Sequence, residues 1–396
     1  MNIPAHILNI YQKPKTGSAF VARKQAYNYR HQISANGWFD TASCDLKMTT
    51  IEAEMALENY VGNPMRVYVD NPAQPIWEGI ITTVSYDSGG ALVRRSIDTM
   101  MNRAEVVVQF RRDPIGSQVN ITNAANLLPS QAIYGIKEGS ISAGVIEVNN
   151  PSTYADSMRD TLVEINGWPQ SSITQGSNVN VKIEMKGYYH TLDWEMHWVI
   201  PNLAAISASA LISALLADVT NTTLWFDNAD LSGVEANVSW TLREQTRIGM
   251  TKWQGFQRVT EGGNASGDYY IVGIEPTNFV TGTRRLYYRQ GNSAVEYTAK
   301  AKDGLRVRNA QGGLVRPWTV KPDRVLRITD VMTGWNGLGD DPRDVYLRSI
   351  TYDAERQTIR WQGGDNTTGE GIFQVHEYHK RTDNRWSKSK WLTVYI

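Results

Sequence analysis

Two pairs of histidines are the first residues whose types and spacing could do chemistry. His376 and His379 are separated by two residues, which in a helix would place both imidazoles on one face, as in many metal sites. The surrounding residues instead predict a strand followed by a loop, where positions i and i+3 point to opposite sides. No acidic residue follows at ligand spacing. We therefore expect no metal site.

The second pair, His190 and His197, flanks Asp193, as the members of an acid–base cluster could. Trp194 and Trp198 lie beside them in a segment with the pattern of a core and a turn. Such surroundings favour buried, hydrogen-bonded histidines over a catalytic pair. We expect these two histidines to be structural.

Four carboxylates could serve in glycoside hydrolysis, which needs two of them about 5–10 Å apart across a cleft. They are Glu275, Asp340, Asp341 and Asp365, and the sequence selects no pair among them. The chain also lacks a Gly-x-Ser-x-Gly elbow, a phosphate-binding Gly-Lys-Ser/Thr loop and a His-Glu-x-x-His motif. We therefore predict no catalytic residue and no cofactor, and expect that the protein is not an enzyme.

Charge and length limit the class of protein. The 396 residues include 40 basic and 40 acidic side chains, a balance that argues against a dedicated nucleic-acid binder. Residues 1–242 hold 16 Lys and Arg against 23 Asp and Glu, and residues 243–396 hold 24 against 17. This asymmetry is either ordinary surface variation or the sign that the two halves face different neighbours. The length allows about two to four domains.

Cys44 is the only cysteine, so that no intrachain disulfide can form. The chain shows no secretory signal pattern and no apolar run long enough to span a membrane. We expect folding in the cytoplasm of a cell. The 13 Trp and 19 Tyr, against 7 Phe, are typical of subunit interfaces and sugar-binding faces.

The residues from 49 to 110 give the clearest structural pattern. Thr49 and Glu52 form a capping box, and a short helix with Ile51, Met55, Ala56 and Leu57 on its apolar face should follow. Three segments with strand patterns come next, separated by Pro- and Gly-containing turns. This order predicts a small antiparallel barrel capped by one helix.

These residues resemble the first tube-type β-barrel of the hub proteins in the tails of tailed bacteriophages. The resemblance rests on the run VYVDNPAQPIWEGIITTVSYDSGG and on four further stretches, which follow one another in the order that such hubs use. The five stretches are residues 67–90, 96–110, 181–195, 251–289 and 344–364.

The resemblance implies a mainly β (α+β) fold with two tube-type antiparallel β-barrels, each with a short helix. Pattern changes along the chain and the resemblance together divide it into five parts. We expect the first barrel at 1–112, an inserted mixed α/β domain at 113–180, the second barrel at 181–294, a β-rich domain at 295–377 and a basic, aromatic arm at 378–396.

The resemblance further implies a structural virion protein, made in the host bacterial cytoplasm, that forms the hub of a tail baseplate or tip. A homotrimer with two barrels per chain would present a pseudo-six-fold ring to the tail tube or distal tail protein. A spike, tip or tape measure protein would lie on its other side, and DNA would pass through its channel. Twelve residues are predicted at subunit interfaces: Trp77, Gly79, Asp87, Gly89, Gly90, Arg284, Arg285, Tyr287, Arg385, Trp386, Trp391 and Tyr395.

Three alternatives remain open at this stage. A distal tail protein that forms hexameric rings belongs to the same structural class. A carbohydrate-binding receptor-recognition protein of the tail would also be β-rich and aromatic, and a glycoside hydrolase would need one of the carboxylate pairs above. The basic, aromatic arm could also bind single-stranded nucleic acid by stacking and phosphate contacts, although we expect it to dock at an interface.

Overall fold

The fold is known from a computed structural model of the chain. It describes residues 4–12, 20–69, 74–112, 116–122, 124–146, 151–175, 181–196, 206–217, 219, 225–238, 241–242, 250–264, 266, 268–278, 282–300, 305–329, 343–364 and 373–374. The arm predicted at 378–396 lies outside these residues.

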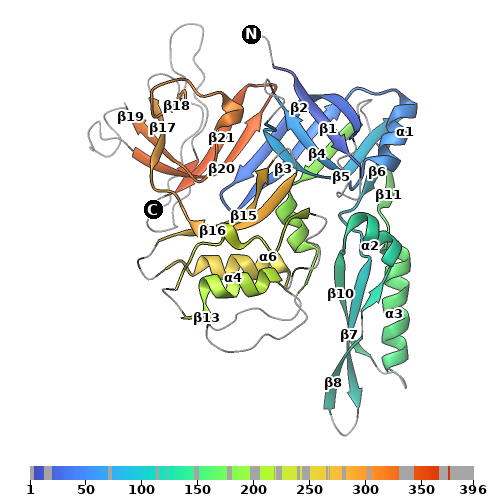
Figure 1. The fold of residues 1–396 in the computed structure, drawn as a ribbon. Coiled ribbons are helices and arrows are strands. Elements are labelled where there is room, and N and C mark those ends of the chain that lie inside the picture. The colour runs from blue at the N-terminus through green and yellow to red at the C-terminus, as the bar shows by residue number, and fades with distance from the viewer. Residues whose placement is uncertain are drawn as a thin grey trace.

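Six antiparallel strands close a barrel at the centre of the molecule (Figure 1). Around the barrel the order is β1, β2, β3, β12, β5, β4 and back to β1. The strands are β1 (His6–Tyr11), β2 (Phe20–Ser34), β3 (Gly37–Leu46), β4 (Pro64–Tyr68), β5 (Trp77–Ser88) and β12 (Val181–Lys186). Their inward side chains, such as Leu8, Ile10 and Ile183, are fully buried, as expected for alternate residues of strands with one covered face. The predicted mainly β class is confirmed.

The barrel takes its sixth strand from a distant part of the chain. β12 lies between β3 and β5, although the sequence places residues 181–186 at the beginning of the second expected barrel. Period-two patterns show which side of a strand is buried, but not which strand pairs with it. Among the described strands, no second set closes on itself; most of the other strands extend the sheet of this barrel, and the remainder form two smaller sheets.

Helix α1 (Thr50–Asn59) begins with the predicted capping box, in which Thr49 and Glu52 each bond the other's backbone amide. Its buried face is only partly the one expected. Ala56 is buried as expected and Ala53 is buried as well, whereas Ile51 and Met55 are 72% and 59% exposed. Small side chains let the helix lie close to β5, and Ala53 is about 200° around the helix from Ile51. The large apolar residues therefore point outward.

An insertion leaves the barrel after β6 (Ala91–Ser96) and returns as β11 (Gln170–Gln175), which pairs antiparallel with β6. It holds a second sheet and two helices, which project from the barrel beside α1 (Figure 1). These elements are β7 (Arg103–Arg112), β8 (Gly116–Ile121), β9 (Ala125–Asn126), α2 (Leu128–Tyr134), β10 (Glu138–Ile146) and α3 (Pro151–Asn166). The sequence predicts a short helix within residues 123–135 and a second helix over residues 152–165, and both are present.

A helical layer and one hairpin follow β12. The hairpin joins the sheet where β15 runs parallel to the beginning of β3, and α4 and α6 cover it (Figure 1). The elements are η1 (Tyr188–Asp193), β13 (Ile206–Ser207), α4 (Ala208–Ala217), η2 (Leu231–Gly233), β14 (Thr241–Leu242), α6 (Lys252–Glu261), β15 (Tyr270–Asn278) and β16 (Thr283–Gln290). Trp253 and Phe256 of α6 are buried in the main core, so this layer and the barrel share one core.

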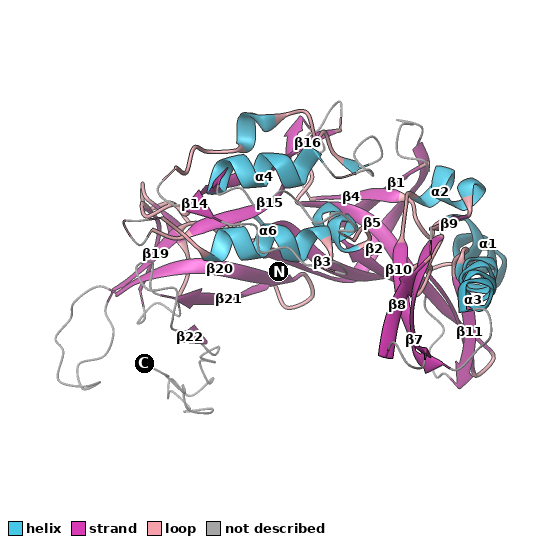
Figure 2. Ribbon diagram, turned by 90° about the horizontal axis from the view of Figure 1, so that it is seen from below, coloured by secondary structure: helices cyan, strands magenta, loops and turns pink. Residues whose placement is uncertain are grey.

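The C-terminal strands continue the wall of the barrel, because β20 pairs with β2. Figure 2 shows β19, β20 and β21 extending to one side of the molecule, away from the insertion. They are β17 (Val295–Lys300), β18 (Arg308–Asn309), β19 (Val325–Thr329), β20 (Arg343–Asp353), β21 (Thr358–Gly364) and β22 (Phe373–Gln374), with the single turn η4 (Pro317–Thr319) between β18 and β19. A separate cluster of buried apolar side chains lies under these strands.

Two buried histidines lie where β2 meets β20. His31 Nδ1 is 3.0 Å from the hydroxyl of Tyr29, and His6 Nε2 is 3.2 Å from the hydroxyl of Tyr352. Both imidazoles are almost fully shielded from solvent. Burial, with a smaller contribution from His6, lowers the pKa of His31 to about 3. The fold therefore holds a neutral imidazole at this junction.

This histidine should make folding stability depend on pH. Its pKa is about 3 in the folded chain and about 6.5 in the unfolded chain. The unfolded state binds the proton first as the pH falls, so that stability is complete above pH 6.5 and decreases below it, by about 1.4 kcal/mol per pH unit. We expect urea unfolding at pH 7 and pH 5 to show this loss. In His31→Gln the loss between the two pH values should be smaller by about 2 kcal/mol; equal losses would contradict the prediction.

Candidate functional site: the polar junction of the barrel and the outer strands

One buried ion pair ties β16 to the barrel. Arg284 donates from Nε and Nη2 to the two oxygens of Glu78, at 2.6 and 2.9 Å, and both side chains are at most 2% exposed. Arg66 adds a third contact to Glu78 at 3.2 Å. The Arg284 guanidinium also lies over the ring of Tyr188, 3.8 Å from its centroid. Burial lowers the pKa of Arg284, but the charge of Glu78 and the neighbouring groups raise it overall, so Arg284 stays charged.

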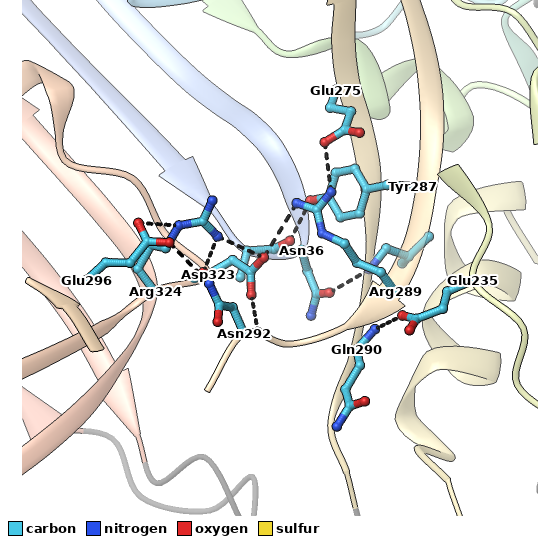
Figure 3. Close-up of polar contacts among 12 residues, drawn as sticks. Asn36, Glu235, Glu275, Tyr287, Arg289, Gln290, Asn292, Glu296, Asp323 and Arg324 are labelled. Atoms are coloured by element: carbon cyan, nitrogen blue, oxygen red, sulfur yellow. Dashed lines mark hydrogen bonds and ion pairs between the residues drawn. The ribbon is translucent and has the colours of Figure 1, made fainter. Parts of the chain in front are cut away.

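A second group of polar side chains is centred on Asp323, just before β19 (Figure 3). Asp323 is 1% exposed and accepts hydrogen bonds from the amide of Asn292 at 2.8 Å and the hydroxyl of Tyr346 at 2.9 Å. Arg289 and Arg324 each approach its Oδ2 at 3.5 Å. Asp323 therefore joins the end of the β15–β16 hairpin to β20.

The neighbouring carboxylates of this junction also form ion pairs with arginines (Figure 3). Glu275 accepts from Arg285 at 3.0 Å and from Arg289 at 2.9 Å, and Glu296 accepts from Arg324 at 2.8 Å. Burial lowers the pKa of Arg289, but Glu275 raises it by more. These carboxylates hold arginines in place, an arrangement suited to fixing the hairpin on the C-terminal strands and not to proton transfer.

The outer wall of the barrel carries a shallow hollow of about 310 Å³. Opposite charges line it in pairs: Lys186 and Asp98 are 2.8 Å apart, as are Lys182 and Glu184. Burial raises the pKa of Asp98, but its interactions with Lys186, Lys137 and Ser96 together lower it by more. None of its lining residues in the described part of the chain is Trp, Tyr or Phe, so the hollow lacks the stacking surface typical of a sugar site.

The candidate acid–base residues form no catalytic set in the described residues. His190 Nε2 lies 2.9 Å from Asp40. Burial raises the pKa of Asp40, but its interactions with His190, Tyr189 and Lys186 lower it overall. Asp193 instead accepts a hydrogen bond from Thr251. Glu275 belongs to the arginine group above. The remaining candidates lie outside the described residues: His197, Asp340, Asp341, Asp365, His376 and His379.

The predicted interface residues of the first hairpin fall into two groups. Trp77 is fully buried, and a Cβ on Gly79 would lie 2.2 Å from the carbonyl oxygen of Lys186, so both serve the packing of the barrel itself. Asp87, Gly89 and Gly90 form the exposed turn between β5 and β6, where both glycines have positive φ. This turn stays a candidate for contact with a neighbour.

The predicted interface residues of the second hairpin are mostly internal. Arg284 and Tyr287 are buried, and the Tyr287 hydroxyl donates to the carbonyl of Ala35. Arg285 is partly exposed. The other four lie outside the described residues: Arg385, Trp386, Trp391 and Tyr395.

The described tryptophans serve mainly the core. Trp168 is exposed and two others are half-buried, whereas the buried ones are Trp77, Trp194, Trp225, Trp253 and Trp361. A count of aromatic residues could not separate these places. Within the described part of the chain, no group of three or more His, Cys, Asp or Glu is placed to hold a metal ion, and no helix there is long and apolar enough to cross a membrane.

Sequence reasoning missed the two acidic centres, Glu78 and Asp323. Glu78 stands inside a strand in which ten successive residues are buried, and a charged residue in such a run signals a buried partner. Asp323 follows Pro322 and has φ of 58°, a backbone conformation that Asp tolerates better than most residues. Neither signal identifies the arginines that pair with them.

Comparisons with known proteins give little further guidance. No protein-family model matches the chain, and a search of the curated proteins finds no match. Among solved structures, the tail protein from Neisseria meningitidis MC58 is similar over 91% of this chain and 97% of that chain, with 9% sequence identity and a TM-score of 0.37. A TM-score of this size does not establish a common fold.

Proposed function

We propose that this protein is a structural component of a bacteriophage tail, the hub that connects the tail tube to the tip or spike. Its role would be mechanical: copies of the chain form a ring whose channel lets DNA pass. Its partners would be further copies of itself, a tail tube or distal tail protein on one side and a spike, tip or tape measure protein on the other. It would act in the virion at the baseplate or tip, after synthesis in the host cytoplasm.

The observation that carries this proposal is the closed barrel whose wall continues into outer strands on both sides. The paired strands lead from β11 at one end, through the barrel, to β22 at the other. Sheet ends of this kind offer backbone groups for pairing between subunits. Arginines bind the carboxylates described above. The junction is therefore suited to keeping the two ends of the sheet in fixed positions.

One observation favours a second candidate, a distal tail protein that forms hexameric rings. The resemblance to hubs implies two barrels in each chain of a trimer, but the described strands close one barrel. Six copies with one barrel each would match a six-fold tube as well as three copies with two. The number of subunits in the ring therefore separates the two candidates.

The first test is the mass of the purified chain in solution, measured by light scattering or mass photometry, with negative-stain images of the same sample. We expect a ring of three subunits with an axial opening. A ring of six would favour the distal tail protein. A monomer at all concentrations would contradict both structural roles, and glycan-array binding by that monomer would favour the receptor-recognition alternative.

A further inference from the structure

Strand β11 ends the sheet without the usual protection of an exposed edge. Among the described strands it pairs with β6 alone, and its sequence, QSSITQ, contains no charged residue and no proline. Natural proteins commonly block free edges with lysine, proline or a bulge, because an open row of backbone groups recruits another strand. Ile173, in the middle of β11, is 72% exposed. This edge has the features of a strand-pairing site.

Helix α1 adds a second exposed apolar surface next to this edge. It packs against β5 and β6, and β6 is the strand that carries β11 (Figure 1). Ile51 and Met55, one turn apart, point outward from it. The helix also carries three glutamates and no basic residue. A partner that fits here would supply a strand for β11, apolar side chains for Ile173 and Met55, and positive charge for α1.

One segment of this chain has all three properties. Residues 375–396 contain five Lys and Arg against two Asp and Glu, with Trp386 and Trp391 among them. The sequence predicts a strand over residues 391–396, in which Leu392 alternates with Thr393 and further apolar and polar residues follow. Opposite charge brings such a segment to α1, and strand addition would then hold it on β11.

The occupant is a segment from another copy, because β11 and the C-terminal strands lie at opposite ends of the sheet. β11 lies beside α1 and the insertion, whereas β20 and β21 lie on the far side of the barrel (Figures 1 and 2). β22 is the last described strand before residues 375–396 and pairs with β21 there. A contact between one end of a protomer and the other end of the next is heterologous, and such contacts form a ring when the rotation between neighbours closes.

We propose that residues 385–396 of one protomer add as a strand to the β11 edge of the next, under the acidic and apolar face of α1. This inference rests on the proposed ring function, since it names the contact that joins neighbouring subunits. The binding surface is then formed by β11 and α1, and the predicted interface residues of the arm contact this surface on the next protomer. The contact needs no ligand, metal or other protein.

Disulfide cross-linking between two variants, each with one introduced cysteine, tests the contact directly. Ser171→Cys places a thiol on the exposed edge of β11, and Thr393→Cys places one on the arm; the native Cys44 is buried. The two variants, tagged to differ in mass, are mixed and oxidised. We expect a mixed dimer on a non-reducing gel. Gln311→Cys, an exposed position beside β18, is the matched control and should give no mixed dimer with Thr393→Cys.

A second change tests the surface without disturbing the fold. Ile173→Lys, in the chain that also carries Ser171→Cys, introduces a charge that blocks strand addition, while its exposure predicts an unchanged melting temperature. The yield of mixed dimer should decrease at least about tenfold, a change that corresponds to about 1.4 kcal/mol of binding free energy.

Three other results would overturn the inference in distinguishable ways. If mass photometry shows a ring but the Ser171→Cys and Thr393→Cys pair gives no product, the contact is wrong and the ring function stands. If a chain with both cysteines closes its disulfide at the mass of one chain, the arm docks on its own protomer. If the unmodified chain is a monomer at every concentration, the ring function fails and this contact with it.

Discussion

Replacing Glu78 by Gln should be among the most destabilising conservative changes in this protein. The change keeps the size of the side chain and removes its charge, which leaves Arg284 buried at 2% exposure without its counter-charge. Breaking one half of a buried ion pair costs about 3–5 kcal/mol of the free energy of unfolding. Chemical denaturation followed by circular dichroism would measure the loss.

An exposed ion pair of the same geometry provides the control. Arg327 and Asp344 form two hydrogen bonds of 2.7 and 2.8 Å, but both side chains are more than 40% exposed. Water already solvates these charges, so Asp344→Asn should leave the denaturation midpoint nearly unchanged. Equal effects of the two substitutions would show that burial does not govern the strength of the Glu78 pair.

Replacing both partners shows whether the cost comes from the lost ion pair itself or from leaving the charge of Arg284 buried without a partner. If Glu78→Gln is costly because Arg284 is left unpaired, then Glu78→Leu together with Arg284→Met should be less destabilising than the sum of the two single changes. The coupling between contacting residues of this kind is about 0.5–3 kcal/mol. Additive effects would mean that Glu78 and Arg284 contribute independently, for example through Arg66.

Local signals in the sequence predicted the elements better than their pairing. The capping box of Thr49 and Glu52 and the two helices of the insertion are present. Strand patterns at residues 269–274 and 283–288 also predict the hairpin that β15 and β16 form. Each of these features depends on residues close together in the chain, whose hydrogen bonds or periodicity can be read directly.

The pairing of distant strands could not be predicted in the same way. β12 lies in the barrel between β3 and β5, although about ninety residues separate it from β5 in the chain. The pattern of residues 181–186 does not indicate with which strands it pairs. The prediction of which face of α1 is buried was wrong in part, for a related reason. Ile51 and Met55 were expected inside because they are large and apolar, but the helix contacts the barrel through the small side chains of Ala53 and Ala56.

The interface residues show how a pattern can be ambiguous between core and contact surface. Tyr287 and Trp77 are aromatic residues of the type enriched at interfaces, yet both are fully buried within the protomer. A buried core and a subunit interface exclude water from the same kinds of side chain, and the sequence does not say which one a residue joins. Exposure in the fold leaves the turn at Gly89 and Gly90 and Arg285 as places to test. The arm lies outside the described residues and stays a prediction.

Replacing Asp323 by Ala should destabilise the attachment of the C-terminal strands by a comparable amount. The hydroxyl of Tyr346, which is buried, would lose its acceptor, and an unsatisfied buried polar group costs about 1–3 kcal/mol. Asp323 also has φ of 58°, where an ordinary side chain costs about 1–2 kcal/mol. The weaker contacts to Arg289 and Arg324 are lost as well. We therefore expect the free energy of unfolding to decrease by about 3–5 kcal/mol, since losses of this size are typical when a buried polar network is broken.

Asp323→Asn separates the effects of backbone and charge at this position. Asn tolerates the positive φ and keeps one oxygen for the Tyr346 hydroxyl, so its cost should be less than half that of Ala. Hydrogen exchange adds the local readout: because β19 and β20 are joined to the hairpin through Asp323, their amides should exchange faster in Asp323→Ala while those of the barrel strand β4 keep their protection. Uniformly faster exchange would show that the barrel and the C-terminal strands unfold as one unit and that Asp323 is not the joint between them.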